Sequence, residues 1–277
     1  MRRLPASTLV ILAVLLAFGL AALLAPLIAP HDPLRQSLLL RLKPPGTVDP
    51  RQGFFALGTD DLGRDLLSRI LYGARASFAV AILSVTVSLA LGVTLGLAAG
   101  WFRGWTAAIV MRLVDTMLSI PAILLAVLTV AVIGPGFLDL VLVLGLTRWP
   151  RYTRVTYAST LQVASMPFIQ ASEMAGTGAA RLLRRHVLPN IAGPILVVAT
   201  SEFGLMILFE AGLSFLGLGI QPPAPSWGSI LSAGRQYVER AWWLTVFPGI
   251  GLFVLVVCVN LLGDLLRDQL DPRSARR

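Results

Sequence analysis

The amino-acid sequence predicts an all-α fold, a polytopic membrane protein with about six transmembrane helices. Apolar residues make up 56% of the 277 residues and charged residues only 13%, a composition that excludes an ordinary soluble domain of this length. Long runs with few or no charges also recur along the chain. Their length of about 20 residues is what an α-helix needs to cross the hydrocarbon core of a bilayer.

Five apolar runs are clear candidates for membrane spans. They are residues 8–29, 78–100, 107–133, 191–216 and 243–262. The first run follows Arg2 and Arg3, as a signal peptide would, but it is longer than a typical signal sequence. Pro26 and Pro30 also stand where a small-residue cleavage site would be needed. We therefore expect this run to remain in the protein as an uncleaved anchor.

A sixth span is expected over a shorter apolar run. Residues 138–147 would reach only about 15 Å as a helix, which is half of a bilayer core. The helix must therefore continue through residues 149–157, with the side chains of Arg148, Arg151 and Arg154 extending to the interface. Hydrophobic periodicity alone leaves both five and six spans open.

The basic residues indicate how the spans are oriented. The formal net charge is +9, which would suggest nucleic-acid binding in a soluble protein, but here the charges lie mostly in the loops. With six spans and both termini inside, most Lys and Arg residues lie in inside segments. The long outside loop of residues 31–76 also contains several, which weakens this bias without reversing it. We therefore expect a membrane protein with no nucleic-acid partner. The single cysteine, Cys258, lies in the last span, which excludes a disulfide framework.

Two short helices are expected outside the spans. In the long loop, Thr59 or Asp60 is expected to cap an amphipathic helix at the interface. The apolar face of that helix would consist of Leu62, Leu66, Leu67 and Ile70. Ser226 is expected to cap the second short helix, over residues 227–237.

Three glycines predict how the second span packs. Gly92, Gly96 and Gly100 recur at intervals of four residues and therefore share one face of the helix. A helix face without side chains allows a second helix to approach closely. We expect these glycines to serve helix packing within the chain.

Ionisable residues within the spans are candidates for functional groups, because charge inside a membrane is costly. Glu202 and Glu210 interrupt the fourth apolar run. For Glu210, expected near the outer end of its span, two roles stay open: a gate or cavity residue, or a structural partner of a backbone group or an arginine. Arg112 and Asp115 are three residues apart on one helix face, which predicts an ion pair. A channel or secondary transporter could use these four residues to line its pathway, so that alternative stays open.

Several chemistries are excluded. A nucleotide phosphate loop needs Gly-Lys-Ser/Thr, but the only lysine is Lys43, which stands between Leu42 and Pro44. The chain is therefore not expected to be an ATPase or another enzyme, and no catalytic residue is assigned. His31, His186 and Cys258 lack any spacing that suits a metal site, so we expect no metal and no cofactor in this chain.

A polar, basic segment separates two of the apolar runs. Residues 173–190 read Glu-Met-Ala-Gly-Thr-Gly-Ala-Ala-Arg-Leu-Leu-Arg-Arg-His-Val-Leu-Pro-Asn. The segment resembles the cytoplasmic coupling loop of ABC-importer permeases, which has a Glu-Ala-Ala start, a glycine and a His-x-Leu-Pro end. The matching residues are Glu173, Gly176, His186, Leu188 and Pro189. The interval from the glutamate to the glycine is three residues where the family has six, so we expect a coupling loop that is three residues shorter.

Within this segment we expect a short helix over residues 179–186, preceded by a tight turn at Gly176 and Gly178 and ended by Pro189. The resemblance implies that the segment contacts an ATPase. The residues assigned to that contact are Glu173, Ala175, Gly176, Arg184, His186, Leu188 and Pro189. An ordinary basic loop, held inside by its charge, would explain the arginines of this segment equally well.

Three other blocks narrow the resemblance. Residues 55–77, 210–228 and 260–273 resemble blocks of the dipeptide, oligopeptide and nickel branch of the importer permeases. The resemblance implies the type I ABC importer transmembrane fold. It also implies four parts: an anchor helix and outside loop in residues 1–76, a transmembrane domain in 77–265, its coupling loop in 165–190, and a cytoplasmic basic tail in 266–277.

The same resemblance implies a function and partners. The chain would be one permease subunit of an ATP-driven importer in the bacterial inner membrane, with both termini in the cytoplasm. It would form half of a pathway for peptides, nickel or another small solute, with Glu202 and Glu210 as gate or pathway residues. Its expected partners are a sister permease chain in a heterodimer, two ATP-binding subunits that hold the ATP, and an extracytoplasmic solute-binding protein. A requirement for a separate ATPase would distinguish this function from an ATP-independent channel or secondary transporter.

Overall fold

The computed structural model describes residues 6–270, and these residues are almost entirely helical. The α-helices are α1 (Ala6–Leu23), α2 (Ala25–Ile28), α3 (Leu66–Phe102), α4 (Gly104–Ser119), α5 (Ala122–Ile133), α6 (Phe137–Ala164), α7 (Pro167–Met174), α8 (Ala179–Leu182), α9 (Leu188–Phe215), α10 (Trp227–Gly234) and α11 (Trp243–Leu270). Shorter elements are the 3-10 turns η1 (Leu38–Leu40) and η3 (Arg235–Tyr237), the π-helical turn η2 (Leu183–Val187), and an antiparallel hairpin of β1 (Thr47–Asp49) and β2 (Gly53–Phe55). The all-α prediction is confirmed, whereas Arg2, Arg3 and the last residues of the basic tail, 271–277, lie outside the described residues.

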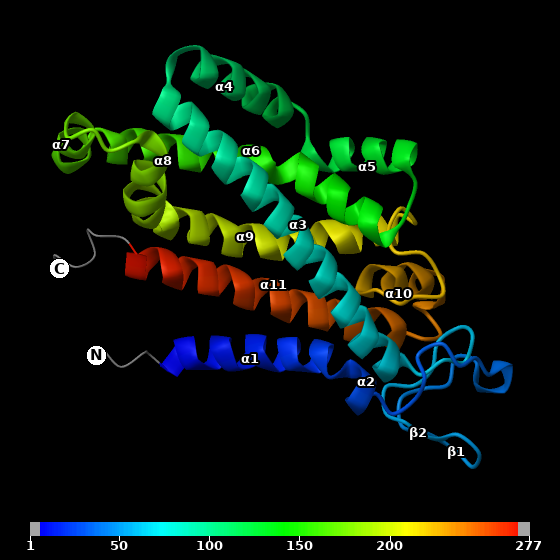
Figure 1. Cartoon of the computed structure of the whole chain (residues 1–277). Helices are drawn as coiled ribbons and strands as arrows, with labels where there is room; N and C mark the ends of the chain where they lie inside the picture. The colour runs from blue at the N-terminus through cyan, green and yellow to red at the C-terminus, as the bar shows by residue number, and fades with distance from the viewer. Residues whose placement is uncertain (1–5, 271–277) are drawn as a thin grey trace.

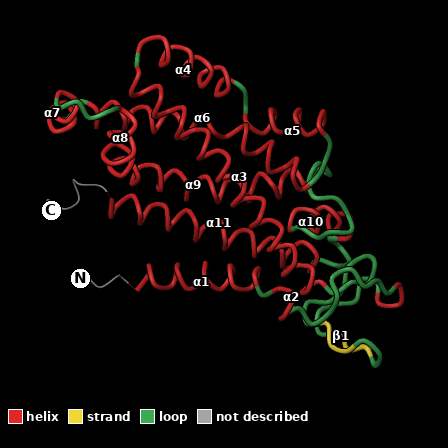
Figure 2. Tube along the Cα trace, viewed as in Figure 1, coloured by secondary structure: helices red, strands yellow, loops and turns green. Residues whose placement is uncertain are grey.

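The long helices run side by side between two ends of the molecule (Figure 1). One end, here called the hairpin end, holds β1, β2 and α10. The other, here called the α7 end, holds α7 and α8 together with the start of α1 and the end of α11. Figure 2 shows that most of the loop structure gathers at the hairpin end. The hairpin end thus contains most of the loops, whereas the α7 end is mainly helical and α7 protrudes from it.

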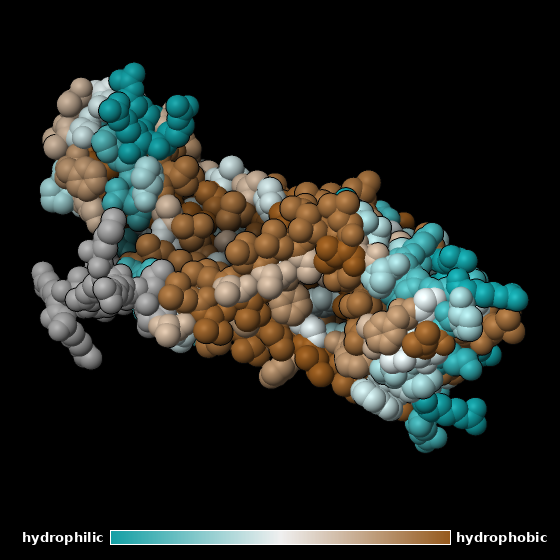
Figure 3. Space-filling view, turned by 90° about the horizontal axis from the view of Figure 1, so that it is seen from below, coloured by the Kyte–Doolittle hydropathy of each residue, from teal (hydrophilic) through white to brown (hydrophobic). Residues whose placement is uncertain are grey.

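The surface has the character of a membrane protein. Figure 3 shows a belt of hydrophobic side chains between two hydrophilic ends. Among residues 6–270, four helices are long and apolar enough to cross a membrane: α1, α3, α11 and the continuous helix Ala179–Phe215, which joins α8, η2 and α9. Helices α4 and α5 are long and apolar enough only when taken together, and they make a fifth span if the bent pair counts as one. Helix α6 is 28 residues long, packs against α3 and α9, and supplies the sixth long element.

The third predicted span is not one straight helix. Residues 107–133 are divided between α4 and α5, whose axes differ by 89°. The break falls at Ile120, which is extended with φ −96° and ψ 129°. The next residue is Pro121. A proline cannot donate a helical hydrogen bond, and it disfavours the helical conformation of the residue before it. The expectation of an unbroken third span was therefore wrong.

The glycine face of α3 packs against α6, as predicted. A Cβ atom on Gly92 would lie 2.4 Å from the Cβ of Tyr152. A Cβ atom on Gly96 or Gly100 would lie 2.6 Å from the Cβ of Thr156 or Thr160, respectively. These separations are well below contact distance, so the two helices approach as closely as they do only because all three positions are glycine.

The helix starts were predicted with mixed success. Asp65 caps α3 by accepting a hydrogen bond from the backbone N–H of Ser68 at 2.8 Å. The predicted separate helix capped by Thr59 or Asp60 is therefore absent, because Leu66 and Ile70 already belong to α3, which begins well before residue 78. Ser226 does cap α10, through a capping box with Ser229.

Candidate functional site

The predicted tight turn lies between α7 and α8. Gly176 has a φ of +80°, and its N–H donates to the carbonyl of Glu173 at 2.9 Å, while the N–H of Thr177 donates to the carbonyl of Ser172 at 3.1 Å. This pair of bonds around a left-handed residue is the common way to end a helix, and glycine adopts it at the lowest cost. Gly178 has a φ of −63° and needs no glycine. The turn is thus confirmed at Gly176.

The helix that follows does not end at Pro189. Helix α8, the π turn η2 and α9 form one continuous helix from Ala179 to Phe215. In η2 the N–H of Leu188 donates to the carbonyl of Leu183, one residue further back than in an α-helix. The altered bonding immediately precedes Pro189, whose nitrogen cannot donate, and this proline lies in the first turn of α9. The expected stop at Pro189 was wrong.

The short helix that stays separate from the long helices is α7. Its Ile169 is buried against a cluster that includes Val187 and Ile191, and the ring of Phe168 meets the ring of His186 edge-on at 6.2 Å. The opposite side projects from the molecule, since Met174 is 90% exposed. Helix α7 is therefore held firmly at its base and presents an apolar tip.

The residues predicted to contact an ATPase gather at the α7 end (Figure 1). The exposed ones are Glu173, Ala175, Gly176, Arg184 and Pro189, and the half-buried ones are His186 and Leu188. A hollow of about 520 Å³ on α8 and η2 is lined by Ala180, Arg181, Arg184 and Arg185. The α7 end therefore combines a protruding helix with a basic surface.

The short interval between Glu173 and Gly176 does not require a deletion. Gln170 stands six residues before Gly176, at the spacing that the family motif gives to its glutamate, and it lies within α7. Helix α7 runs without interruption over eight residues, from Pro167 to Met174. A glutamine at the motif position would explain the unusual interval as a substitution.

A buried ion cluster joins α6 to α9. The carboxylate of Glu202 accepts from Arg148 twice, from Nε at 2.8 Å and from a terminal guanidinium nitrogen at 2.9 Å. Arg151 donates to the same carboxylate at 3.2 Å. Glu202 is 1% exposed and Arg148 is 7% exposed. Arg148 therefore does not extend to the interface as predicted, because its partner lies inside the bundle.

Asp115 pairs with Arg154 and not with Arg112, the partner that its spacing predicted. Arg154 pairs with Asp115 at 2.5 Å across α6 and α4, and both side chains are about half exposed. Asp115 thus finds its partner on a neighbouring helix, and the predicted ion pair with Arg112 was wrong. Sequence spacing identifies neighbours within one helix but not across two.

A pocket of about 570 Å³ opens beside this cluster. Its lining residues come from α4, α6 and α9 and are Leu118, Arg151, Arg154, Val155, Val197, Val198, Ser201 and Glu202. Of the residues predicted for the pathway, Glu202 thus lies at a pocket. Glu210 lies elsewhere.

Glu210 is fully buried near the hairpin end of α9. Its two carboxylate oxygens accept from the hydroxyls of Ser77 at 2.6 Å and Ser214 at 2.7 Å. Among the described residues, the partners of Glu210 are thus serine hydroxyls, and not the backbone group or arginine named in one of the two expected roles. The hydroxyl of Ser214 in turn accepts from the backbone N–H of Ile220 at 3.3 Å, so Glu210 ties α3 and α9 to the loop that leads into α10.

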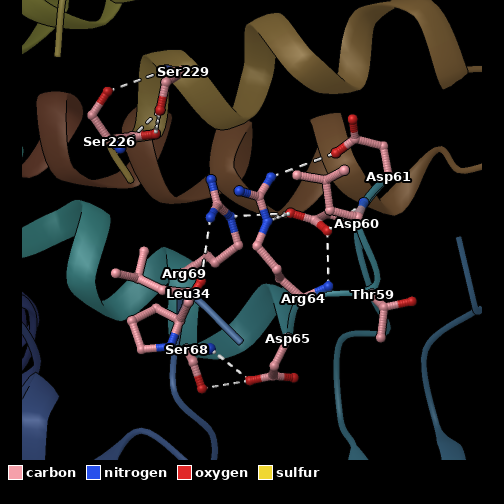
Figure 4. A network of polar contacts seen from close by, with 12 residues as sticks. Leu34, Thr59, Asp60, Asp61, Arg64, Asp65, Ser68, Arg69, Ser226 and Ser229 are labelled. Carbon is pink, nitrogen blue, oxygen red and sulfur yellow. Dashed lines mark hydrogen bonds and ion pairs between the residues drawn. The ribbon is translucent and has the colours of Figure 1, made fainter. Parts of the chain in front are cut away.

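A second ion network, which the sequence analysis missed, fixes the loop at the hairpin end (Figure 4). The Oδ2 atom of Asp60 accepts from Nε of Arg64 at 2.6 Å and lies 3.2 Å from Nε of Arg69. Arg69 also donates to the carbonyl of Pro33 at 3.3 Å. The signal was the density of charge in residues 60–69, which an exposed amphipathic helix does not explain. All three charged side chains are buried, so the loop has a defined shape.

The predicted absence of a metal site can be compared with the described residues. Among residues 6–270, no group of three His, Cys, Asp or Glu side chains is placed to hold a metal ion.

Family comparisons agree with this arrangement. Residues 92–276 match the family described as the binding-protein-dependent transport system inner membrane component. Residues 7–45 match the N-terminal TM domain of oligopeptide transport permease C. Together these two matches cover both the anchor helix and the part of the chain that contains the α7 end and both buried carboxylates.

Individual relatives are similar over most of their length. The chain is 44% identical to the di/tripeptide transport system permease protein DppC of Pseudomonas aeruginosa, over 91% of this chain and 83% of the relative. It is 44% identical to the dipeptide transport system permease protein DppC of Escherichia coli, over 91% and 84%. It is 41% identical to a putative peptide transport system permease protein of Brucella suis, over 95% and 86%.

Two solved structures share the fold. The inward-facing MetNI methionine ABC transporter superposes on 73% of this chain and 95% of its own, with a TM-score of 0.56 and 20% identity. An amino acid ABC transporter crystallised with histidines superposes with a TM-score of 0.54 and 16% identity, over 73% and 94%. At these identities the likeness supports the transmembrane fold of ABC importers.

Proposed function

The chain belongs to the family of binding-protein-dependent transport system inner membrane components, and on that premise we propose that it carries small peptides, chiefly dipeptides, inward across the bacterial inner membrane. It is a multi-pass permease subunit of an ABC importer. The peptide substrate rests on the relatives of Pseudomonas aeruginosa and Escherichia coli, whose names specify di- and tripeptides or dipeptides. Nickel has no such support.

We propose that two ATP-binding subunits dock at the α7 end and that this end faces the cytoplasm. Three observations support the docking: α7 protrudes, its tip is apolar with Met174 at 90% exposure, and three arginines line a hollow on the α8 and η2 turns that follow it. The basic surface also favours the cytoplasmic side of the membrane. Both chain termini would then be cytoplasmic, since α1 starts and α11 ends at the α7 end (Figure 1). ATP would be held by the partners, because Lys43 is the only lysine and forms no phosphate loop.

The hairpin end then faces outward, where a solute-binding protein would deliver the peptide. Its loop is kept in one shape by Asp60, Arg64 and Arg69, and a defined surface suits repeated docking. A sister permease chain would complete the pathway, of which this chain forms half. We propose a heterodimer, as the family resemblance implies.

The observation that carries the mechanism is the continuous helix from Ala179 to Phe215. Helix α7 is packed against its base through Ile169 and Val187, so a displacement of α7 must move that base. We expect the movement to continue along α9, past Pro194, to Glu202 in its middle and Glu210 near its far end, because closely packed interiors transmit strain. Association of the ATP-binding subunits would in this way alter the packing of α9 against α3 and α6, and the pathway would open alternately to either side.

The function is tested by reconstitution. The chain, its sister permease, the ATP-binding subunits and the binding protein are assembled in liposomes, and uptake of a labelled dipeptide is measured. We expect uptake that requires ATP, and no ATP hydrolysis by the purified chain alone. Uptake that continues without ATP or the ATP-binding subunits would instead establish a channel or secondary transporter. Uptake of nickel ions in place of the dipeptide would overturn the peptide assignment.

A further inference from the structure

The middle of α6 carries charge on the outer surface of the chain. Arg151 lies at the midpoint of α6 and Glu202 at the midpoint of α9, and each helix is 28 residues long. At 1.5 Å per residue, Arg151 is roughly 20 Å from either end of α6, and Glu202 is roughly 20 Å from the end of α9 at Phe215. The side chain of Arg151 is nevertheless 54% exposed. An exposed arginine halfway along a helix of the bundle would be costly against lipid tails, so we expect this surface to border water or protein in the assembled importer.

The positive charge of this cluster exceeds the negative charge. Glu202 supplies one carboxylate, and both of its oxygens already accept from Arg148. Arg151 contributes a second guanidinium, which reaches Glu202 through one nitrogen at 3.2 Å. Its other guanidinium nitrogens have no partner within residues 6–270. Arg154 does not change the balance, because Asp115 neutralises it. Arg151 is thus a cation with donors to spare.

Arg151 stands at one side of a largely apolar pocket. The pocket has a volume of about 570 Å³, and its apolar walls are Leu118, Val155, Val197 and Val198. A guanidinium with free donors is the group best suited to bind a carboxylate through two hydrogen bonds. The apolar walls, in contrast, make no directional demand on what they touch. The polar lining residues are Arg151, Arg154, Ser201 and Glu202. Since Arg154 pairs with Asp115 and Glu202 with Arg148, Arg151 is the anion-binding point beside walls that tolerate different side chains.

We propose that Arg151 binds the C-terminal carboxylate of the peptide as it passes through the pathway, while the apolar walls accept its side chains. This inference rests on the proposed function, because it assumes that the pocket borders the pathway and that the solute is a peptide. It adds the chemical group that is recognised and the residue that recognises it. Every peptide with a free C-terminus carries this carboxylate, whatever its side chains.

The test compares a dipeptide with its C-terminal amide in the complete reconstituted importer. Initial rates of ATP-dependent uptake are measured for both solutes, and their ratio is taken for each variant. The preference of the binding protein enters every ratio equally and cancels between variants, as in a double-mutant cycle. We expect Arg151→Gln to reduce the ratio of acid to amide about tenfold, the effect of losing a charged hydrogen-bond donor. Arg151→Lys, which keeps the charge, should retain part of the preference.

Arg112→Gln is the matched control, since Arg112 is also exposed but does not line the pocket. Its ratio should equal that of the unmodified chain. An unchanged ratio in Arg151→Gln, with uptake continuing, would overturn the inference and leave the proposed function intact; it would favour an acidic residue of the sister chain as the partner of Arg151. If Arg151→Gln transports neither solute, Arg151→Lys decides, and an unchanged ratio there overturns the inference. Absence of ATP-dependent uptake by the unmodified importer would instead count against the proposed function.

Discussion

Arg148 and Glu202 are 54 residues apart in the chain and form a bidentate ion pair in the middle of the bundle, with N–O distances of 2.8 and 2.9 Å. The pair links α6 to α9 at half their length. Transfer of both charges from water is costly, so the pair adds little net stability compared with apolar packing. Removing one member is a different matter, because it leaves the other charged and buried.

We predict that Glu202→Gln destabilises the chain by about 3–5 kcal/mol, because Arg148 then remains buried without its counter-charge. Thermal unfolding of the detergent-solubilised importer measures the effect. Replacing both residues, as Arg148→Met with Glu202→Leu, should be less harmful than Glu202→Gln alone. Glu239→Gln is the control, since Glu239 is exposed in the loop before α11, and it should unfold like the unmodified chain. Equal unfolding of Glu202→Gln and the control would show that the pair is not formed.

This pair also marks the limit of what the sequence predicted. The apolar runs identified the long helices because bilayer thickness sets their length, and the Gly92–Gly96–Gly100 face was predicted from helical spacing alone. The partner of Glu202 could not be found in this way, because no periodicity specifies which helices become neighbours. The same reason explains why Asp115 was assigned to Arg112 within its own helix instead of to Arg154.

At the candidate coupling site, local rules predicted the turn and the helix that begins at Ala179, but neither the continuation of that helix past Pro189 nor the separate helix α7. The left-handed turn at Gly176 follows from local backbone geometry, which sequence reports well. The identity of the protruding helix depends on the packing of Ile169 against Val187 and Ile191, which are distant from it in sequence. Pro189 was read as a helix stop, although a proline in the first turn of a helix is well tolerated.

The glycine that ends α7 gives a second prediction. Gly176→Ala should reduce ATP-dependent uptake and weaken retention of the ATP-binding subunits, while leaving the chain in the membrane. An added Cβ meets nothing within 4 Å, but a φ of +80° costs an alanine about 1–2 kcal/mol relative to glycine. The matched control is Gly178→Ala, which is equally unobstructed but has a φ of −63°. Equal uptake and equal co-purification of the ATP-binding subunits in both variants would contradict the role of the turn.

The contact between α3 and α6 gives a third prediction. Gly96→Leu should destabilise the chain by about 1–3 kcal/mol or more, the usual cost of inserting atoms into a packed interface. Even a Cβ at this position would lie 2.6 Å from that of Thr156. The yield of monodisperse importer after detergent extraction measures the effect. Gly212→Leu is the control, because Gly212 is also helical but has nothing within 4 Å of its added Cβ. If both variants are extracted equally well, α3 and α6 do not approach each other as closely as described.

The claim that α7 is the element moved by the ATP-binding subunits is tested most directly by photocrosslinking within the assembled importer. A photoreactive amino acid is placed at Met174, which is 90% exposed at the α7 end, or at Leu39, which is 88% exposed in the loop of the hairpin end. We predict that the probe at position 174 crosslinks to an ATP-binding subunit and that its yield changes when ATP is added. The probe at position 39 should crosslink to no ATP-binding subunit. A probe at position 174 that never reaches an ATP-binding subunit, or one at position 39 that does, would contradict the account.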